Sequence, residues 1–208
     1  MAVRPTPDRD RVTARLPAAL RRRQLLNVAG RAFSVGGYHG TSMDDVAEAA
    51  GVTKPVLYQH FGSKRELYVE LLDDTAQQLM TAITGATSRA GSPRAQVEQG
   101  VAAYFGFVAE HEGAFRLLFG GGTKRDLEFA VAVASVEEAI ADVIAALIAA
   151  DIDQDHRRVL GHAIVGMAEH ACRHWLAGDR EVGPAELARE VAELAWSGLR
   201  GVSRPAQA

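Results

Sequence analysis

The chain has 208 residues and a net charge of −3, with 48% hydrophobic and 24% charged residues, a globular balance that is sufficient to bury a core. Its single cysteine, Cys172, excludes an internal disulfide and fits a reducing cytoplasm, where we expect the protein to act. The first twenty residues have no apolar run typical of a signal peptide, and three acidic residues within residues 130–150 favour a buried helix, so no membrane partner is expected.

The charge is distributed unevenly along the chain. Residues 1–70 contain 11 lysines and arginines against 7 acidic residues, whereas residues 71–208 contain 12 against 19. A basic head with a net charge of +4 on an acidic body with a net charge of −7 indicates that only the head meets a polyanion.

In chain order, residues 1–16 are polar and rich in arginine, and we expect them to form a disordered basic arm. A helix begins at Pro17, which suits a first turn, and Leu25 and Phe33 belong to its apolar face. A pair of glycines, Gly36 and Gly37, ends this helix.

Two short helices are predicted next. Thr41 precedes Asp44 by three residues, a variant of the capping box, and predicts a helix over residues 43–50. Gly51 then supplies a turn, and Thr53 caps a second short helix, whose first turn tolerates a proline.

The rest of the chain also has helical periodicity. Ser63 caps a helix over residues 64–84. Further apolar segments with a helical period lie at residues 94–110, 113–119, 126–150, 154–177 and 184–200. Glycine, proline and aspartate separate them, including a glycine connector at residues 120–122, and no strand pattern is present. We therefore predict an all-α fold of about nine helices.

Two short helices joined at Gly51 and braced by a longer one form a helix-turn-helix pattern. The second short helix of such a pattern enters a major groove about 12 Å wide, with its first residues near the base edges. Lys54 suits a guanine edge or a phosphate, and Val56 suits a thymine methyl. Lys64 begins the next helix, where backbone N–H groups also favour a phosphate.

Residues 20–68 resemble the DNA-binding domain of the TetR family of bacterial repressors. The resemblance rests on Gly37-Tyr38-x-x-Thr41-Ser42, Val46-Ala47-x-x-Ala50-Gly51-Val52 and Leu57-Tyr58-x-x-Phe61-x-x-Lys64, which follow one another without a gap. It implies that the helix from Thr53 to His60 is the recognition helix. The DNA-binding residues expected on this basis are Thr41, Ser42, Thr53, Lys54, Pro55, Val56, Tyr58, Gln59, His60 and Lys64.

Several of these residues have a second interpretation. Thr41 and Ser42 are expected to be helix caps first and phosphate contacts second. His60 is assigned equally to DNA contact and to packing at a helix end, whereas Tyr58 is expected to contact phosphate and Phe61 to lie in the core. Many family members have a glycine and a hydroxyl residue in place of Pro55 and Val56, so their operator sequence does not transfer. The neighbouring arginines at 21–23 are expected to add non-specific attraction.

Residues 94–177 place many large apolar side chains on amphipathic helices. Ordinary core packing accounts for them, and the resemblance implies in addition a cavity for a small, largely apolar effector. The candidate pocket residues are Tyr104, Phe105, Phe115, Phe119, Phe129, Met167, His170, His174 and Trp175. His170 and His174 have a metal-ligand spacing, but nothing completes such a site, so neither a metal nor another cofactor is expected.

The last predicted helix carries an apolar stripe rich in small residues. Such a helix closes the core of its own chain or pairs with another copy. In the TetR family the last two long helices form a four-helix bundle between subunits, so the resemblance implies a homodimer, which also suits an operator with two half-sites. The expected interface residues are Leu187, Val191, Leu194, Ala195 and Leu199.

The sequence therefore predicts a DNA-binding transcriptional regulator, with a helix-turn-helix domain at residues 17–66 and an effector-binding and dimerisation domain at residues 67–208. The family favours a repressor that a small effector releases from a palindromic double-stranded operator. An enzyme is disfavoured because the G-x-S-x-G, G-x-G-x-x-G and H-E-x-x-H patterns are absent. The remaining alternative is a helical adaptor or small-molecule-binding protein that does not bind DNA.

Overall fold

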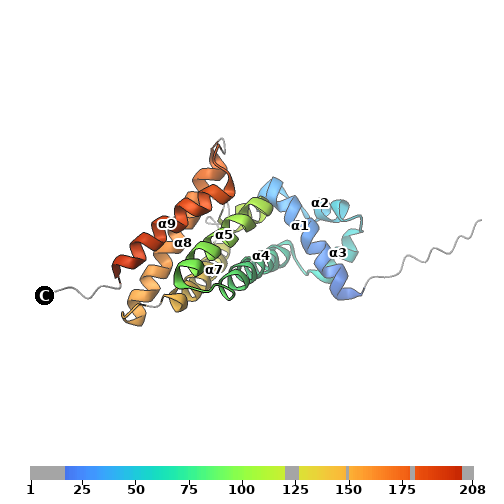
Figure 1. The fold of residues 1–208 in the computed structure, drawn as a ribbon. Coiled ribbons are helices and arrows are strands. Elements are labelled where there is room, and N and C mark those ends of the chain that lie inside the picture. The colour runs from blue at the N-terminus through green and yellow to red at the C-terminus, as the bar shows by residue number, and fades with distance from the viewer. Residues whose placement is uncertain (1–16, 120–126, 149, 179–180, 203–208) are drawn as a thin grey trace, which may run out of the picture.

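The computed structural model describes residues 17–119, 127–148, 150–178 and 181–202, and across these ranges the chain forms nine helices and no strand (Figure 1). The predicted all-α fold of about nine helices is therefore confirmed. The arm expected over residues 1–16 and the connector at 120–122 lie outside these ranges. None of the helices in these ranges is long and apolar enough to cross a membrane.

The N-terminal head consists of α1 (Ala18–Gly40), α2 (Met43–Ala49) and α3 (Lys54–His60), grouped at one end of the molecule (Figure 1). Each of the three helices contributes at least one apolar side chain to a common hydrophobic core. Phe33, Val46 and Leu57 are each at most 1% exposed, and Phe61, just after α3, is completely buried as predicted. Burial of this kind is what stabilises helices as short as α2 and α3.

The predicted capping box is displaced by one residue. The N-cap of α2 is Ser42, whose hydroxyl accepts from the Asp45 backbone N–H, while the Asp45 carboxylate accepts from the Ser42 N–H. These bonds lower the pKa of Asp45. Thr41 does not cap because its side chain is buried and its hydroxyl donates to the Ala32 carbonyl at 3.2 Å.

Other helix ends agree with the predictions more closely. Gly37 interrupts α1 with a φ of 66°, in the region where glycine is favoured, so the predicted stop is present as a kink. Ser63 caps α4 by accepting from the Glu66 N–H, as predicted. Thr53 is the N-cap residue of α3, but its hydroxyl makes no capping hydrogen bond.

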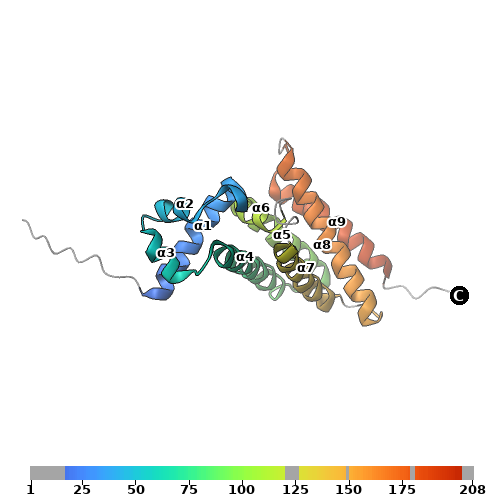
Figure 2. The same cartoon turned by 180° about the vertical axis from the view of Figure 1, so that it is seen from behind.

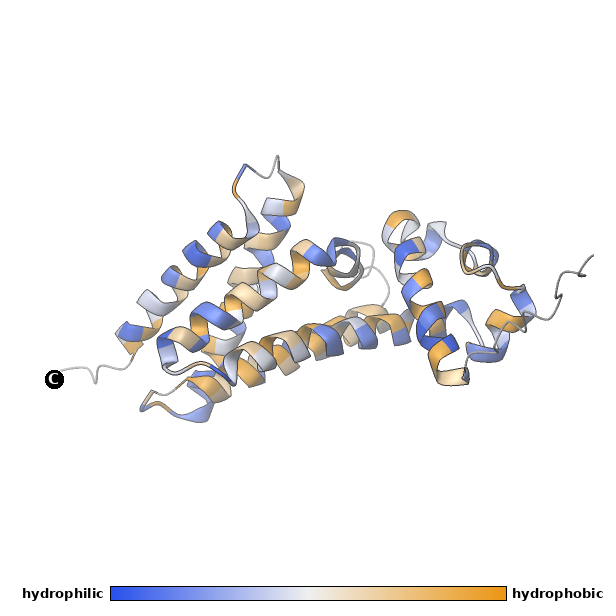
Figure 3. Ribbon diagram, turned by 45° about the vertical axis from the view of Figure 1, so that its right-hand side comes forward, coloured by the Kyte–Doolittle hydropathy of each residue, from blue (hydrophilic) through white to orange (hydrophobic). Residues whose placement is uncertain are grey.

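The C-terminal body contains α4 (Lys64–Thr87), α5 (Pro93–Glu110), α6 (Glu112–Phe119), α7 (Leu127–Leu147), α8 (Gln154–Ala177) and α9 (Pro184–Val202). The main packed pairs are α7 with α8, α5 with α9, and α4 with α5. Figure 2 shows α6 beside the end of α1, where it adds a contact between body and head. Hydrophobic and hydrophilic residues alternate around each helix, which gives every helix a face for the core (Figure 3).

Helices α7 and α8 approach each other closely at Gly161. A Cβ atom at this position would lie 2.4 Å from the Ala141 carbonyl oxygen, which belongs to the backbone and cannot turn aside. Gly161→Ala should therefore push the two helices apart and reduce the free energy of unfolding by about 1–3 kcal/mol, as overpacking does. Thermal or denaturant unfolding measures the change.

Gly106→Ala provides the control for this substitution. Gly106 also lies inside a helix, α5, but its added Cβ would meet nothing within 4 Å. This variant should gain about 0.5–1 kcal/mol from the better helix propensity of alanine. A Gly161→Ala protein that is as stable as the wild type would contradict the close approach of α7 and α8.

Candidate nucleic-acid interface and internal cavity

Helix α3 turns most of its surface outward from the head. Leu57 is its buried residue, whereas Lys54, Pro55 and Gln59 are exposed, and Tyr58 is 42% exposed despite its large ring. The turn that brings α2 and α3 together passes through Gly51, whose φ of 64° is costly for other residues. The structure thus presents a short helix whose outer side chains are free to enter a groove.

Lys54, at the start of α3, is held by an ion pair to α2. Its ammonium group lies 2.8 Å from the Asp44 carboxylate, and both side chains are largely exposed. This hydrogen bond and charge raise the pKa of Lys54, so the ammonium form is favoured. A phosphate that binds Lys54 must therefore compete with Asp44.

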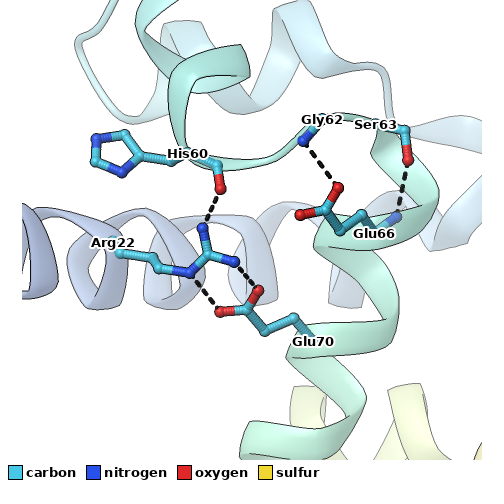
Figure 4. Close-up of polar contacts among 6 residues, drawn as sticks. All are labelled: Arg22, His60, Gly62, Ser63, Glu66 and Glu70. Atoms are coloured by element: carbon cyan, nitrogen blue, oxygen red, sulfur yellow. Dashed lines mark hydrogen bonds and ion pairs between the residues drawn. The ribbon is translucent and has the colours of Figure 1, made fainter.

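Arg22 of α1 joins this helix to α3 and to α4 (Figure 4). Its guanidinium donates to both carboxylate oxygens of Glu70 on α4 and to the backbone carbonyl of His60 at the end of α3. The same group lies 4.3 Å from the centre of the Phe61 ring. Arg22 therefore fixes α3 against α1 and α4, a role that differs from the non-specific attraction expected of the arginines at 21–23.

The beginning of α4 lies next to α3. Gly62 donates its N–H to the Glu66 carboxylate at 3.0 Å, and Ser63 caps the helix (Figure 4). The Lys64 ammonium group lies 4.4 Å from the centre of the Tyr38 ring, a cation–π contact with the end of α1. Lys64 is half-buried: one part of its side chain packs on Tyr38, and the rest is accessible to solvent.

Four aromatic rings form a cluster between head and body, which we term the aromatic junction: Phe33 and Tyr38 of α1, Tyr68 of α4 and Phe129 of α7. The Tyr38–Phe129 and Tyr68–Phe129 ring centres are each 4.7 Å apart, and the Tyr38–Tyr68 centres are 4.9 Å apart. Phe33 adds an edge-on contact with Tyr68 at 5.1 Å. The aromatic junction thus brings α1, α4 and α7 into direct contact.

The body contains an apolar cavity of about 310 Å³, at the small end of the range for small-molecule sites. Five helices line it. The lining residues are Ile83, Thr87, Pro93, Gln96, Val97, Gly100, Val101, Tyr104, Ile140, Ile144, Leu147, Ile148, Ala150, Ile164, Val165, Ala168, Trp196, Leu199 and Arg200. Most of these residues are aliphatic or small, and Tyr104 and Trp196 are the aromatic residues among them.

The sequence identified the region of this cavity but not most of its walls. Of the predicted pocket residues, Tyr104 lines it, whereas Phe105, Phe115, Phe119, Phe129, Met167, His170, His174 and Trp175 are not among its lining residues. Phe105 and Phe119 are buried in the core, and Phe129 belongs to the aromatic junction. Large aromatic side chains fill space, and the cavity lies where aliphatic and small residues meet.

The two predicted pocket histidines of α8 do not line this cavity. His170 and His174 are both exposed, and the His170 ring lies 3.1 Å from the Gly166 carbonyl. Glu169 forms an ion pair with Arg173 on the same helix, and His162 contacts Glu138 on α7. Across the residues that the structure describes, no group of three potential metal ligands occurs.

The predicted interface residues of α9 divide between several environments. Val191 and Ala195 are buried within the protomer, where α9 packs on α5, and Leu187 is partly buried there. Leu199 lines the cavity. Leu194 is 64% exposed and so remains available to a second copy.

Comparison with known sequences gives two kinds of similarity. Residues 25–71 match the profile of the bacterial regulatory proteins of the tetR family, and residues 93–198 match the tetracyclin repressor-like C-terminal domain. The chain is 33% identical over 190 residues to the HTH-type transcriptional activator FasR of Mycolicibacterium smegmatis, covering 90% of this chain and 87% of the relative. The HTH-type transcriptional repressor KstR2 of Mycobacterium tuberculosis is 40% identical over 63 residues, 30% of either chain.

Solved structures agree on the fold. A TetR-like transcriptional regulator from Rhodococcus sp. RHA1 has a TM-score of 0.74 at 31% identity, covering 90% of this chain and all of its own. The regulator FadR from Bacillus subtilis, solved in complex with stearoyl-CoA, has a TM-score of 0.75 over 85% of this chain and 98% of its own. At 16% identity, the second comparison concerns the fold alone.

The Lys54–Asp44 ion pair leads to a prediction on DNA affinity. Asp44→Asn should release Lys54 to neutralise one more phosphate, so binding to a non-specific duplex should tighten several-fold at low salt. The dependence of log K on log salt should steepen by about one unit. Fluorescence anisotropy at a series of salt concentrations measures both changes.

The matched control is Glu48→Gln, which also removes one exposed negative charge from α2. It leaves the Lys54–Asp44 pair intact, so the salt slope should not change. Equal effects of the two substitutions would show that the ion pair does not restrain Lys54.

Proposed function

The chain belongs to the TetR family of bacterial transcriptional regulators, and from this premise we propose that its DNA-binding head reads a palindromic operator and is released when a largely apolar effector enters the cavity of its body. The head is assigned to residues 17–66 and the effector-binding and dimerisation body to residues 67–208. Release of this kind makes the protein a repressor wherever its operator overlaps a promoter. Named relatives include both an activator and a repressor.

One observation carries the proposal: α4 and α7 each contribute residues both to the aromatic junction and to the cavity. In α4, Tyr68 belongs to the aromatic junction and Ile83 lines the cavity. In α7, Phe129 belongs to the junction and Ile140 lines the cavity. A ligand that spreads these helices therefore acts on both ends of the same rigid elements.

The consequence for DNA follows from the position of α4. Lys64 begins this helix and contacts Tyr38, and Glu70 holds Arg22, which in turn holds the end of α3. A tilt of α4 thus changes the orientation of α3. In a dimer, such a change alters the separation of the two recognition helices, and heads at the wrong separation cannot both enter successive major grooves.

The contacts proposed for the operator use the exposed groups of α3 and its neighbours. Lys54, Pro55 and Gln59 face outward, and Tyr58 has its ring exposed for a phosphate or sugar. The free Thr53 hydroxyl and the N-terminus of α2 at Ser42 are further phosphate contacts. Thr41 is withdrawn from this set because it is buried.

The coupling can be tested by filling the cavity. Operator DNA is first selected from random duplexes, and release is then assayed with a panel of apolar ligands that includes stearoyl-CoA. An active ligand should weaken operator binding about 5–150-fold, the range of a coupling of about 1–3 kcal/mol. Ala168→Leu places extra methyl groups in the cavity and should keep operator affinity while losing this response.

Ala109→Leu is the control because Ala109 lies on the exposed side of α5, which also lines the cavity. This variant should bind the operator and respond to ligand as the wild type does. An Ala168→Leu protein with an unchanged response would place the effector elsewhere. Failure of the wild type to select any sequence would contradict the operator itself and favour an adaptor.

The proposed homodimer uses the outward surfaces of α8 and α9. Val159 on α8 and Leu194 on α9 are large aliphatic residues that are 65% and 64% exposed on the surface of the protomer. Val191 and Ala195, by contrast, stabilise the protomer because they pack within it. The interface predicted from the sequence is therefore reduced, within α9, to the side that carries Leu194.

Leu194→Asp should yield a folded monomer. The substitution places an unpaired charge in the proposed interface, where its desolvation costs several kcal/mol, whereas inside the protomer Leu194 is 64% exposed and little packing is lost. Light scattering gives the mass and circular dichroism gives the helix content. Val191→Asp should instead unfold the chain, and a wild-type protein that is itself monomeric would contradict the dimer.

A further inference from the structure

We propose that the phenol hydroxyl of Tyr104 recognises the effector by donating a hydrogen bond to an uncharged oxygen, such as the carbonyl of a ketone or ester, at the buried end of an otherwise apolar molecule. The inference rests on the effector cavity proposed above and specifies the chemistry of its ligand. Tyr104 thereby becomes the residue that distinguishes an oxygen-bearing ligand from a plain hydrocarbon.

The hydroxyl of Tyr104 is buried and has no hydrogen-bond partner among the residues that the structure describes. The whole residue is 5% exposed and lines the cavity. Thr87 provides the contrast, because its hydroxyl donates to the Ile83 carbonyl at 3.0 Å and is thus satisfied by its own helix. A buried donor without an acceptor is costly, so a ligand that supplies the acceptor gains the corresponding affinity.

Tyr104 lies at one end of the cavity, because it is the last lining residue along α5. Glu137 and Glu169 act electrostatically on Tyr104, and each lies just beyond a lining residue, Ile140 on α7 and Ala168 on α8. At the other end the walls include Pro93 at the start of α5 and the exposed Arg200 near the end of α9. The residues of α5 between Pro93 and Tyr104 cover about 16 Å at 1.5 Å per residue. An elongated ligand therefore enters with its apolar part along the walls.

The surroundings of the hydroxyl select a neutral acceptor. Burial above all, and then Cys172, Glu169 and Glu137, raise the pKa of Tyr104 well above its ordinary value, so the phenol keeps its proton and acts as a donor. A ligand carboxylate at this end would face the same carboxylates. The nearby cation, Arg173, is paired with Glu169, and its favourable effect on a negative charge here is smaller than the opposing effects of burial, Cys172 and the two carboxylates.

Two probes of similar shape test the inference: 2-nonanone, which carries one carbonyl oxygen, and nonane, which carries none. Binding is followed by the fluorescence of Trp196, which lines the cavity, in a Trp175→Phe background that leaves it as the sole indole. The parent protein should bind 2-nonanone about tenfold more tightly than nonane, as one neutral hydrogen bond allows. Tyr104→Phe should abolish this preference by weakening ketone binding while nonane binding is maintained.

Thr81→Val is the control because it removes a hydroxyl from the exposed side of α4, a helix that also lines the cavity, and it should leave both affinities unchanged. Equal affinity of the parent for the two probes, or an equal loss of both in Tyr104→Phe, would overturn the role of the hydroxyl while the cavity stands. Failure of both probes to bind the parent would overturn the effector cavity as well.

The stability of the ligand-free protein is an independent measurement. Removing a buried hydroxyl that has no partner should leave the Tm of Tyr104→Phe equal to that of the parent or higher. A clear decrease would show that the hydroxyl is satisfied inside the protein and would overturn the inference.

Discussion

The aromatic junction holds the head to the body, and the rest of the structure depends on it. Phe129 of α7 packs against Tyr38 of α1 and Tyr68 of α4 at the same ring separation of 4.7 Å. Rings in such contact prefer tilted or edge-on geometries, so they resist sliding more than aliphatic side chains do. The head therefore has a defined orientation although α2 and α3 are too short to be stable alone.

Polar contacts of Arg22 add to the aromatic junction in fixing the head. Arg22 of α1 donates to the His60 carbonyl at the end of α3 and to Glu70 on α4. The seven-residue helix α3 is thereby held against α1 and α4. The outer side of α3 makes fewer such contacts: Lys54 is paired with Asp44, whereas Pro55, Tyr58 and Gln59 are exposed. Structural contacts and candidate base contacts thus use largely different faces of one short helix, as groove recognition requires.

The body combines tight and loose packing. Gly161 allows α7 and α8 to approach at backbone distance, whereas the same two helices, with α4, α5 and α9, enclose an unfilled apolar cavity. A cavity costs stability, and the buried Tyr104 hydroxyl adds to that cost. In the mechanism proposed above, a ligand that fills the space and accepts the hydrogen bond would recover both, and the contacts of α4 and α7 in the aromatic junction would make this free energy available to reorient the head.

The sequence by itself determined the helices, their approximate ends, the helix-turn-helix and the family, because these depend on local signals such as Gly51, Ser63 and the apolar period. Only the tertiary structure decided how side chains divide between core, cavity and surface. Phe129 and Val191 look like pocket and interface residues in the sequence, yet one joins head to body and the other closes the protomer. The reason is that helical periodicity shows which face is apolar but not which neighbour covers it, and that neighbour is distant in the chain.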